Sequence, residues 1–126
     1  MEALSVPTLD NDQARAVERL LTDDYRMDPL QLLENAGRSL ADLAVRMIDV
    51  PLMDAAILVV AGKNSHGAAA LVAARHLLAR GAWVQIVGTH PPEQYKEYAA
   101  HQLTTLQAMG ATFLWDEEGA TTPLPE

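Results

Sequence analysis

The pattern of apolar and polar positions predicts two helices followed by alternating strands and helices. Residues 55–61 (A-A-I-L-V-V-A) form a continuous apolar run, typical of a strand buried on both faces of a parallel sheet. Shorter runs at 83–87 and 112–115 predict two further strands. Helical spacing predicts helices at 68–80 and 93–109, which Gly81 and Gly110 end.

Two helices are predicted before the first strand. Asp10 and Gln13 have the spacing of a capping box for a helix that runs to about Leu21. Asp28 as N-cap, followed by Pro29 and by Gln31 at the third position, predicts the start of a second helix that ends near Ile48. The inner face of the second helix is expected to comprise Leu33, Gly37, Leu40, Ala44 and Ile48.

This order predicts an α/β fold with a parallel sheet of about three strands. Right-handed crossovers place the strands side by side in the order 3-2-1, which is half of a doubly wound sheet. The strand at 55–61 then has one edge without a partner, so we expect a homo-oligomer or a partner chain that pairs there. All 126 residues fit one domain, with an acidic, proline-containing tail at 116–126 that we expect to be poorly ordered.

Composition narrows the possible partners and compartment. The formal net charge of −8 argues against a nucleic-acid partner. No apolar run approaches the roughly 20 residues that cross a bilayer, and no signal peptide precedes the first helix, so a cytoplasmic protein without a membrane partner is expected. The chain has no cysteine, which excludes disulfides, thiolate metal sites and a cysteine nucleophile.

The junction after the first strand is the main candidate for a binding site. It reads A-G-K-N-S-H-G-A-A-A, a loop that opens a helix, where unpaired backbone amides can bind an anion. Residues 55–92 contain no Asp or Glu but include Lys63, Arg75 and Arg80. This local charge either favours an anionic ligand or only reflects the absence of carboxylates from buried strands.

Four segments together resemble the NAD(P)H-hydrate epimerase family, also called the YjeF N-terminal domain. They are D-N-D-Q-A-R-A-V-E-R-L at 10–20, L-Q-L-L-E-N-A-G at 30–37, L-V-A-A-R-H-L-L-A-R-G-A-W-V at 71–84 and H-Q-L-T-T-L-Q-A-M-G-A at 101–111. The resemblance implies a Rossmann-like three-layer α/β/α fold. It also implies interconversion of the R and S epimers of hydrated NADH or NADPH at a site that holds a potassium ion.

The resemblance also implies a set of ligand-binding residues, although the loop departs from the family pattern. The family carries G-x-G-N-N-G-G-D-G where this chain has G-K-N-S-H-G-A-A-A at 62–70. His66 stands at a potassium-binding position but is a poor ligand for a hard cation, and Ala69 replaces the acidic residue. The candidate cofactor-binding residues are Gly62, Lys63, Asn64, Ser65, His66, Gly67, Ala68 and Ala69, with Glu34 and Asn35 of the E-N-A-G segment. No catalytic residue is assigned.

Several of these residues have alternative roles. Lys63 either contacts a phosphate or is a solvated loop lysine, and His66 could act as a replacement acid or base. Glu34 and Asn35 either lie near the loop or hold the second helix in place by hydrogen bonds. Four further residues have expected structural roles: a satisfied hydrogen bond for His76, the surface for His90, and core-facing positions for Tyr95 and Tyr98.

Three functional hypotheses follow. The first is a degenerate family member that binds a nucleotide-like ligand or a partner chain. The second is an active epimerase completed by a second chain or by a self-dimer, because the family continues beyond the third strand with further strands and a second acidic residue. The third is one half of a split or fragmented protein. The lost acidic residue and the missing half favour the first.

Overall fold

A computed structural model describes residues 5–116 of the chain. It divides into two compact units, residues 1–32 and 33–126, and we describe each by itself. The predicted tail at 116–126 lies, apart from Asp116, outside the described residues. No helix of the described part is both long enough and apolar enough to cross a membrane.

The first unit contains helix α1 (Asn11–Arg19). The predicted capping box is confirmed: the Gln13 amide donates to the Asp10 carboxylate over 2.8 Å, and the Asp10 amide donates to the Gln13 side chain over 2.9 Å. The α-helix ends two residues earlier than expected, and a π-helical turn, Leu20–Asp24, follows it.

Helix α2 (Pro29–Met47) begins in the first unit and continues into the second. The N-cap prediction is confirmed, because the Leu30 amide donates to the Asp28 carboxylate over 2.8 Å and the Asp28 amide donates to the Gln31 side chain over 2.8 Å. The predicted inner face was wrong in one position: Leu40 is 45% exposed, whereas Ala41 is buried.

The second unit contains a parallel three-stranded sheet in the order β1-β2-β3. Its strands are β1 (Ala56–Ala61), β2 (Trp83–Gly88) and β3 (Thr112–Trp115), close to the predicted ranges. Ala56 pairs with Trp83, and Gln85 of the central strand pairs with Thr112. The predicted α/β class and strand order are confirmed.

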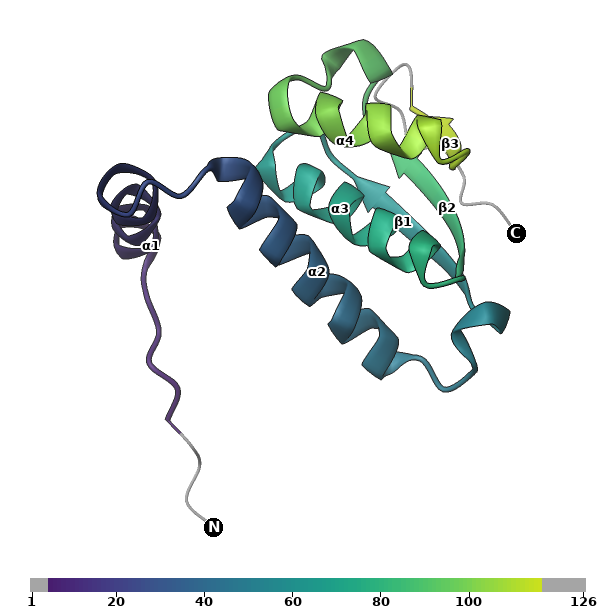
Figure 1. Ribbon diagram of the computed structural model, residues 1–126, viewed down its shortest axis with the longest axis horizontal. Helices are drawn as coiled ribbons and strands as arrows, with labels where there is room; N and C mark the ends of the chain where they lie inside the picture. Colours follow the sequence, from purple (N-terminus) through teal and green to yellow (C-terminus); the bar gives the residue numbers. More distant parts are fainter. Residues whose placement is uncertain (1–4, 117–126) are drawn as a thin grey trace. The chain divides into compact units, whose positions relative to one another are not determined.

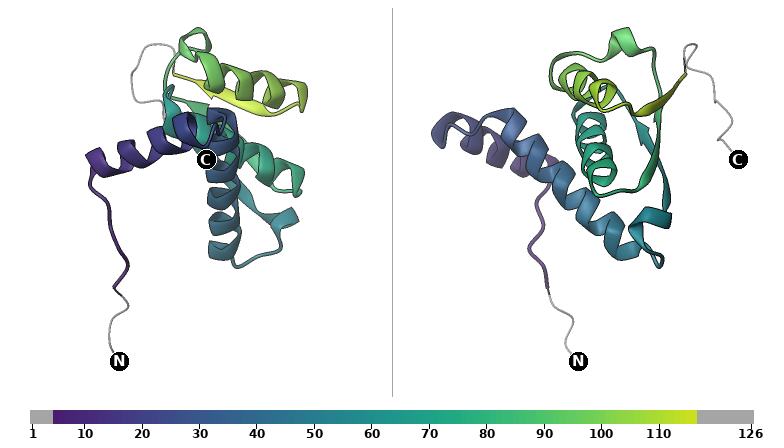
Figure 2. Two further views of the ribbon diagram at one scale, coloured as in Figure 1. Left: turned by 60° about the vertical axis from the view of Figure 1, so that its left-hand side comes forward. Right: turned by 45° about the vertical axis from the view of Figure 1, so that its right-hand side comes forward.

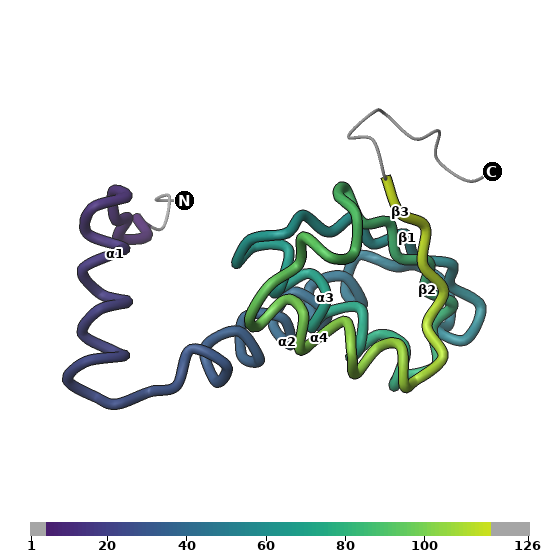
Figure 3. The backbone as a smooth tube through the Cα atoms, turned by 90° about the horizontal axis from the view of Figure 1, so that it is seen from above, coloured from purple at the N-terminus to yellow at the C-terminus, as the bar shows by residue number. Residues whose placement is uncertain are grey.

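Helices α3 (Ser65–Ala79) and α4 (Glu97–Ala108) connect the strands. Figures 1 and 2 show both helices on the same side of the sheet, and Figure 3 shows them side by side. Gly81, with a φ of 99°, follows α3 and Gly110, with a φ of 77°, follows α4 in the left-handed conformation expected of a C′ glycine. The predicted helix at 93–109 is shorter, because a 3₁₀ turn, Pro92–Gln94, and an extended break precede α4.

The core lies between the sheet and these helices. Leu71, Ile86 and Leu106 are fully buried there, one each from α3, β2 and α4. The prediction that β1 is buried on both faces was wrong, because Leu58 and Val60 on its other face are exposed. The described residues thus supply the sheet and one helical layer of a three-layer sandwich.

Candidate functional site

The candidate loop follows β1 at the carboxyl end of the sheet, where open α/β sheets bind their ligands. It is shorter than the sequence predicts, because α3 already begins at Ser65 rather than at 68. The Ala68 amide donates to the Asn64 carbonyl over 2.9 Å and closes the first helical turn. Ser65 to Ala70 therefore form the first turns of a helix, so that only residues 62–64 are loop.

The predicted loop residues divide into an exposed and a buried group. Lys63, Asn64, Ser65 and His66 are exposed, whereas Gly67 and Ala68 are buried. Gly67 lies against the backbone of Gly62, so the first turn of α3 packs directly on the loop. Gly62 and Ala69 are half-buried, so the exposed side chains of the predicted set are those of residues 63–66.

The segment after β2 forms a second wall beside this loop. The Tyr95 hydroxyl donates to the Ala61 carbonyl over 2.6 Å, and the Thr89 amide donates to the same carbonyl over 3.2 Å. Tyr95 is buried, as the sequence predicts, and this burial raises the pKa of its phenol. Tyr95 therefore fixes the 89–96 segment to the end of β1.

A pocket of about 200 Å³ lies between the loop, the start of α3 and the start of α4. Lys63 and Lys96, the only two lysines of the sequence, both line it. Lys63 donates to the Gln94 side chain over 3.3 Å. The other lining residues are Leu33, Asn64, Ser65, Ala68, Glu97, Tyr98 and Ala99.

Lys96 and Glu97 are pocket residues that the sequence analysis did not identify. They lie more than 30 positions from the loop, and no local motif marks them. Glu97 has a φ of 51°, in the left-handed region that non-glycine residues seldom adopt. Such backbone strain is concentrated at functional sites, and here it coincides with the pocket wall.

The charged residues around the pocket favour an anion over a potassium ion. Its lining includes Lys63 and Lys96 against one acidic residue, Glu97. His66 is exposed and offers an imidazole rather than an oxygen ligand. Among the described residues, no cluster of three or more His, Asp or Glu side chains could hold a metal ion.

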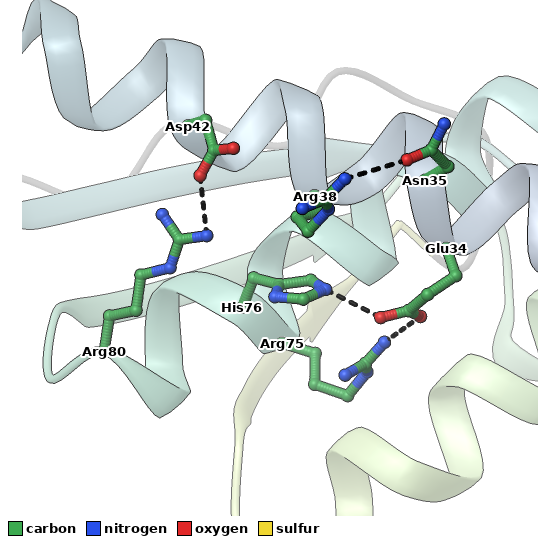
Figure 4. A network of polar contacts seen from close by, with 7 residues as sticks. All are labelled: Glu34, Asn35, Arg38, Asp42, Arg75, His76 and Arg80. Atoms are coloured by element: carbon green, nitrogen blue, oxygen red, sulfur yellow. Dashed lines mark hydrogen bonds and ion pairs between the residues drawn. The ribbon is translucent and has the colours of Figure 1, made fainter.

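The structure places the side chains of Glu34 and Asn35 away from this pocket, although Leu33 lines it. Glu34 forms an ion pair with Arg75 and contacts His76 Nε2 over 2.7 Å, both on α3 (Figure 4). Arg75 chiefly holds the pKa of the Glu34 carboxyl below its ordinary value, against the opposing effect of burial. Asn35 accepts a hydrogen bond from Arg38 over 3.1 Å. These contacts match the alternative role, in which Glu34 holds α2 in place.

The structure also shows the positions of the histidine and tyrosine residues for which structural roles were predicted. His76 has the satisfied contact that the sequence analysis expected of it. His90 is half-buried rather than on the surface, with its Nδ1 2.8 Å from the Thr89 hydroxyl. Tyr98 is 36% exposed and lines the pocket, so the prediction that it faces the core was wrong.

Comparison with known proteins identifies relatives along most of the chain. Residues 29–123 match the family model described as YjeF-related protein N-terminus. The bifunctional NAD(P)H-hydrate repair enzyme Nnr of Salinibacter ruber is 37% identical over 112 residues, which cover 87% of this chain and 20% of the enzyme. The NAD(P)H-hydrate epimerase of Truepera radiovictrix is 42% identical over 84 residues, 66% of this chain and 36% of that protein.

A solved structure supports the fold. The crystal structure of the yeast protein YNL200c matches 90% of this chain and 49% of its own, with a TM-score of 0.79 and 22% sequence identity. This chain thus spans less than half the length of each of these three proteins. Since the family model covers most of the sequence and the strand order agrees with the expected fold, the chain belongs to the family of YjeF-related N-terminal domains.

Proposed function

We propose that this chain binds the phosphate-bearing part of a nucleotide-like ligand, such as NADPH or its hydrated form, without accelerating epimerisation. The observation that carries the proposal is that both lysines of the chain line one pocket at the carboxyl end of β1. Two ammonium groups beside the unpaired amides of a helix start favour a phosphate.

The size of the pocket supports binding of only part of such a ligand. Pockets for whole drug-sized ligands measure roughly 300–1,000 Å³. This pocket, at about 200 Å³, has room for a fragment such as one phosphate with its sugar. The rest of the ligand would extend beyond the loop, past the exposed side chains of Asn64 and His66.

We propose that the chain does not accelerate epimerisation because of the residues that stand where the family loop has its ligand-binding residues. Ala69, at the acidic position, has no group that can move a proton. Among the described residues, no side chain hydrogen-bonds to His66, so nothing orients its imidazole as a base. Catalytic imidazoles are normally held by a second group.

Binding is tested with lysine variants and isothermal titration calorimetry against NADPH and hydrated NADPH. Lys63→Ala and Lys96→Ala should each weaken binding about tenfold, as expected for one charge-assisted hydrogen bond. Arg46→Ala removes the same charge from an exposed position outside the pocket and serves as the matched control. Equal affinity in all four proteins would contradict the proposed site.

Catalysis is tested separately, in potassium buffer with a mixture of the two epimers of hydrated NADH. We expect the purified chain to leave the spontaneous rate of interconversion, followed by chromatography, unchanged. Clear turnover would favour the second candidate, an active epimerase completed by a partner chain or self-dimer. That candidate is supported by sequence identities of 37% and 42% to proteins that are named NAD(P)H-hydrate repair enzyme and NAD(P)H-hydrate epimerase.

The unpaired edge of β1 supports a further element of the proposal, a partner strand from a second copy or another chain. Within the described residues β1 pairs only with β2, which leaves one row of backbone amides and carbonyls available. Sedimentation that depends on protein concentration is the expected result for a homo-oligomer. A protein that stays monomeric at all concentrations would exclude the homo-oligomer and leave pairing of β1 with a different chain as the remaining form of this proposal.

A further inference from the structure

One acidic residue stands in the basic pocket beside the loop. Of the described residues that line this pocket, Glu97 alone is acidic, whereas Lys63 and Lys96 are basic. Glu97 is the first residue of α4, whose start lies beside the start of α3 (Figure 1). A pocket for phosphate alone gains nothing from a carboxylate, because two negative groups in one small cavity repel each other. Glu97 therefore indicates that the ligand carries, next to its phosphate, groups that a carboxylate can bind.

The backbone at Glu97 has a conformation that disfavours its own residue type. Its φ of 51° lies in the left-handed region, which a residue with a Cβ seldom adopts. Gly81 and Gly110 also have a positive φ, of 99° and 77°, without this cost. Glutamate also lacks the short polar side chain with which Asn or Asp supports such a conformation by a local hydrogen bond. A glutamate here is thus explained better by what its carboxylate can bind than by the turn that it forms.

The Glu97 carboxylate is available to a ligand. Glu97 is exposed, and among residues 5–116 no hydrogen bond or ion pair engages its side chain. Glu34 and Asp42, by contrast, are each paired with an arginine. The helix dipole also favours a carboxylate at the start of a helix, but that effect does not depend on whether a ligand carries hydroxyls. It predicts a change in stability without selectivity, so the two explanations are separable by experiment.

The ligand chemistry that fits these residues is a phosphate beside a pair of adjacent hydroxyls. A carboxylate has two oxygens that accept hydrogen bonds, and acidic residues bind ribose hydroxyls in this way in dinucleotide-binding folds. A ribose with a 5′-phosphate presents both groups, the phosphate to Lys63 and Lys96 and the 2′- and 3′-hydroxyls to Glu97. One such unit also suits the pocket volume of about 200 Å³.

Two modified sugars fit this pocket less well. A deoxyribose leaves an acceptor oxygen of Glu97 without a donor. A ribose with a phosphate on its 2′-oxygen places a second anion against the carboxylate, which repels it. NADPH still carries one suitable unit, because the ribose on its nicotinamide side has both hydroxyls free.

We propose that Glu97 is a specificity-determining residue, which binds the ribose hydroxyls of a nucleotide whose phosphate lies at Lys63 and Lys96. This proposal rests on the proposed function, since it names the sugar that accompanies the phosphate in the same pocket. Glu97 selects an unmodified ribose over a deoxyribose and over a ribose that carries a 2′-phosphate.

The test uses the full chain and NMR titration of its backbone amide signals, which measures weak binding of small probes. The probes are AMP, 2′,3′-dideoxy-AMP, adenosine 2′,5′-bisphosphate and inorganic phosphate. We expect the wild-type protein to bind AMP about tenfold more tightly than dideoxy-AMP, as expected for the loss of one charge-assisted hydrogen bond.

Two variants make the result specific. Glu97→Gln removes the charge, so the preference for AMP over dideoxy-AMP should fall below about threefold while the bisphosphate binds more tightly. Glu97→Gly should lose the preference in the same way, and glycine suits a φ of 51°, so this variant keeps its fold. Glu93→Gln is the matched control, because Glu93 is exposed and does not line the pocket.

Each remaining outcome counts against the proposal. Equal binding of AMP and dideoxy-AMP by the wild-type protein, or a preference that Glu97→Gln leaves unchanged, would overturn the role of Glu97. A Glu97 variant that changes stability alone would do the same. If the nucleotides still bind and Lys63→Ala weakens them, the phosphate site of the proposed function stands and only the role of Glu97 fails. If neither inorganic phosphate nor any nucleotide binds, both proposals fail.

Discussion

At the scale of single residues, the two glycines of the candidate loop have different reasons to be glycine. A Cβ on Gly67 would overlap the carbonyl of Gly62, which is backbone and cannot move aside. A Cβ on Gly62 would meet Asn64 Oδ1 at 3.6 Å and Thr89 Oγ1 at 3.9 Å, both ordinary contacts. Gly67 is therefore required for the close approach of α3 to the loop, and Gly62 is not.

We predict that Gly67→Ala lowers the free energy of unfolding by about 1–3 kcal/mol, the usual cost of overpacking. Gly62→Ala, the matched control, should change it by less than about 0.5 kcal/mol. Urea unfolding followed by circular dichroism measures both. Equal stability of the two variants would show that the helix start is not packed on the loop as described.

At the scale of elements, α2 is joined to α3 by packing and by ion pairs. Gly37 lies directly against Val72, so a larger residue there would separate the helices. Glu34 of α2 contacts Arg75 and His76 of α3. Further along the same two helices, Asp42 pairs with Arg80 over 2.7 Å (Figure 4). The contact with α3 also fixes the helix that carries Leu33, which lines the pocket.

We predict that Glu34→Gln lowers the free energy of unfolding at pH 7 by at most about 1 kcal/mol, because a side chain that is 43% exposed is well screened. The pKa of Glu34 is lower in the folded than in the unfolded protein. Its contribution is therefore fully present above the ordinary value of 4.5 and is lost as pH falls through the lower folded value.

The measurement is urea unfolding of wild type and variant between pH 7 and pH 3. The difference in stability should narrow as pH falls below 4.5, where the carboxyl of the unfolded protein becomes neutral, and disappear once pH is below the lower pKa of the folded protein. Glu93→Gln makes the same chemical change at an exposed position and should have no effect. A difference that stays constant to pH 3 would argue against the ion pair.

At the scale of the whole molecule, the second unit is a sheet with helices on one side only. Its two tryptophans report the two faces separately. Trp83 is 74% exposed on the open face, whereas Trp115 packs beside Tyr95 and Phe113, at ring centroid distances of 5.5 and 5.2 Å.

We predict that acrylamide quenches the fluorescence of the isolated chain mainly through Trp83. Trp83→Phe should remove most of the quenchable emission, while Trp115→Phe should retain it. Strong protection of Trp83 in the isolated chain would mean that its own residues or a second copy already cover the open face.

The local features of the fold were predictable because their causes lie within a few residues. The Asp10 and Asp28 caps, the C′ glycines and the three strands each depend on contacts or periodicity inside one element. The early start of α3 and the break at Tyr95 were missed. Both depend on packing, of Gly67 on the loop and of the Tyr95 hydroxyl on the carbonyl of Ala61, 34 residues away.

The candidate site was predictable in position but not in composition. The loop at Lys63 and Asn64 follows from the strand and helix signals around it, whereas Lys96 reaches the pocket only because β2 and α4 bring it there. Glu34 shows the converse, since the sequence allowed it either a place at the site or a role in holding the second helix, and the fold decides by pairing it with α3.

The sequence by itself determined the α/β class, the strand order and the family, because apolar periodicity, capping residues and motif order are properties of the chain alone. The tertiary structure decided which lysines share a pocket, what Glu34 contacts and which face of the sheet is open. These depend on the crossovers that bring distant segments together. An apolar strand residue has the same sequence signature whether a helix covers it or not.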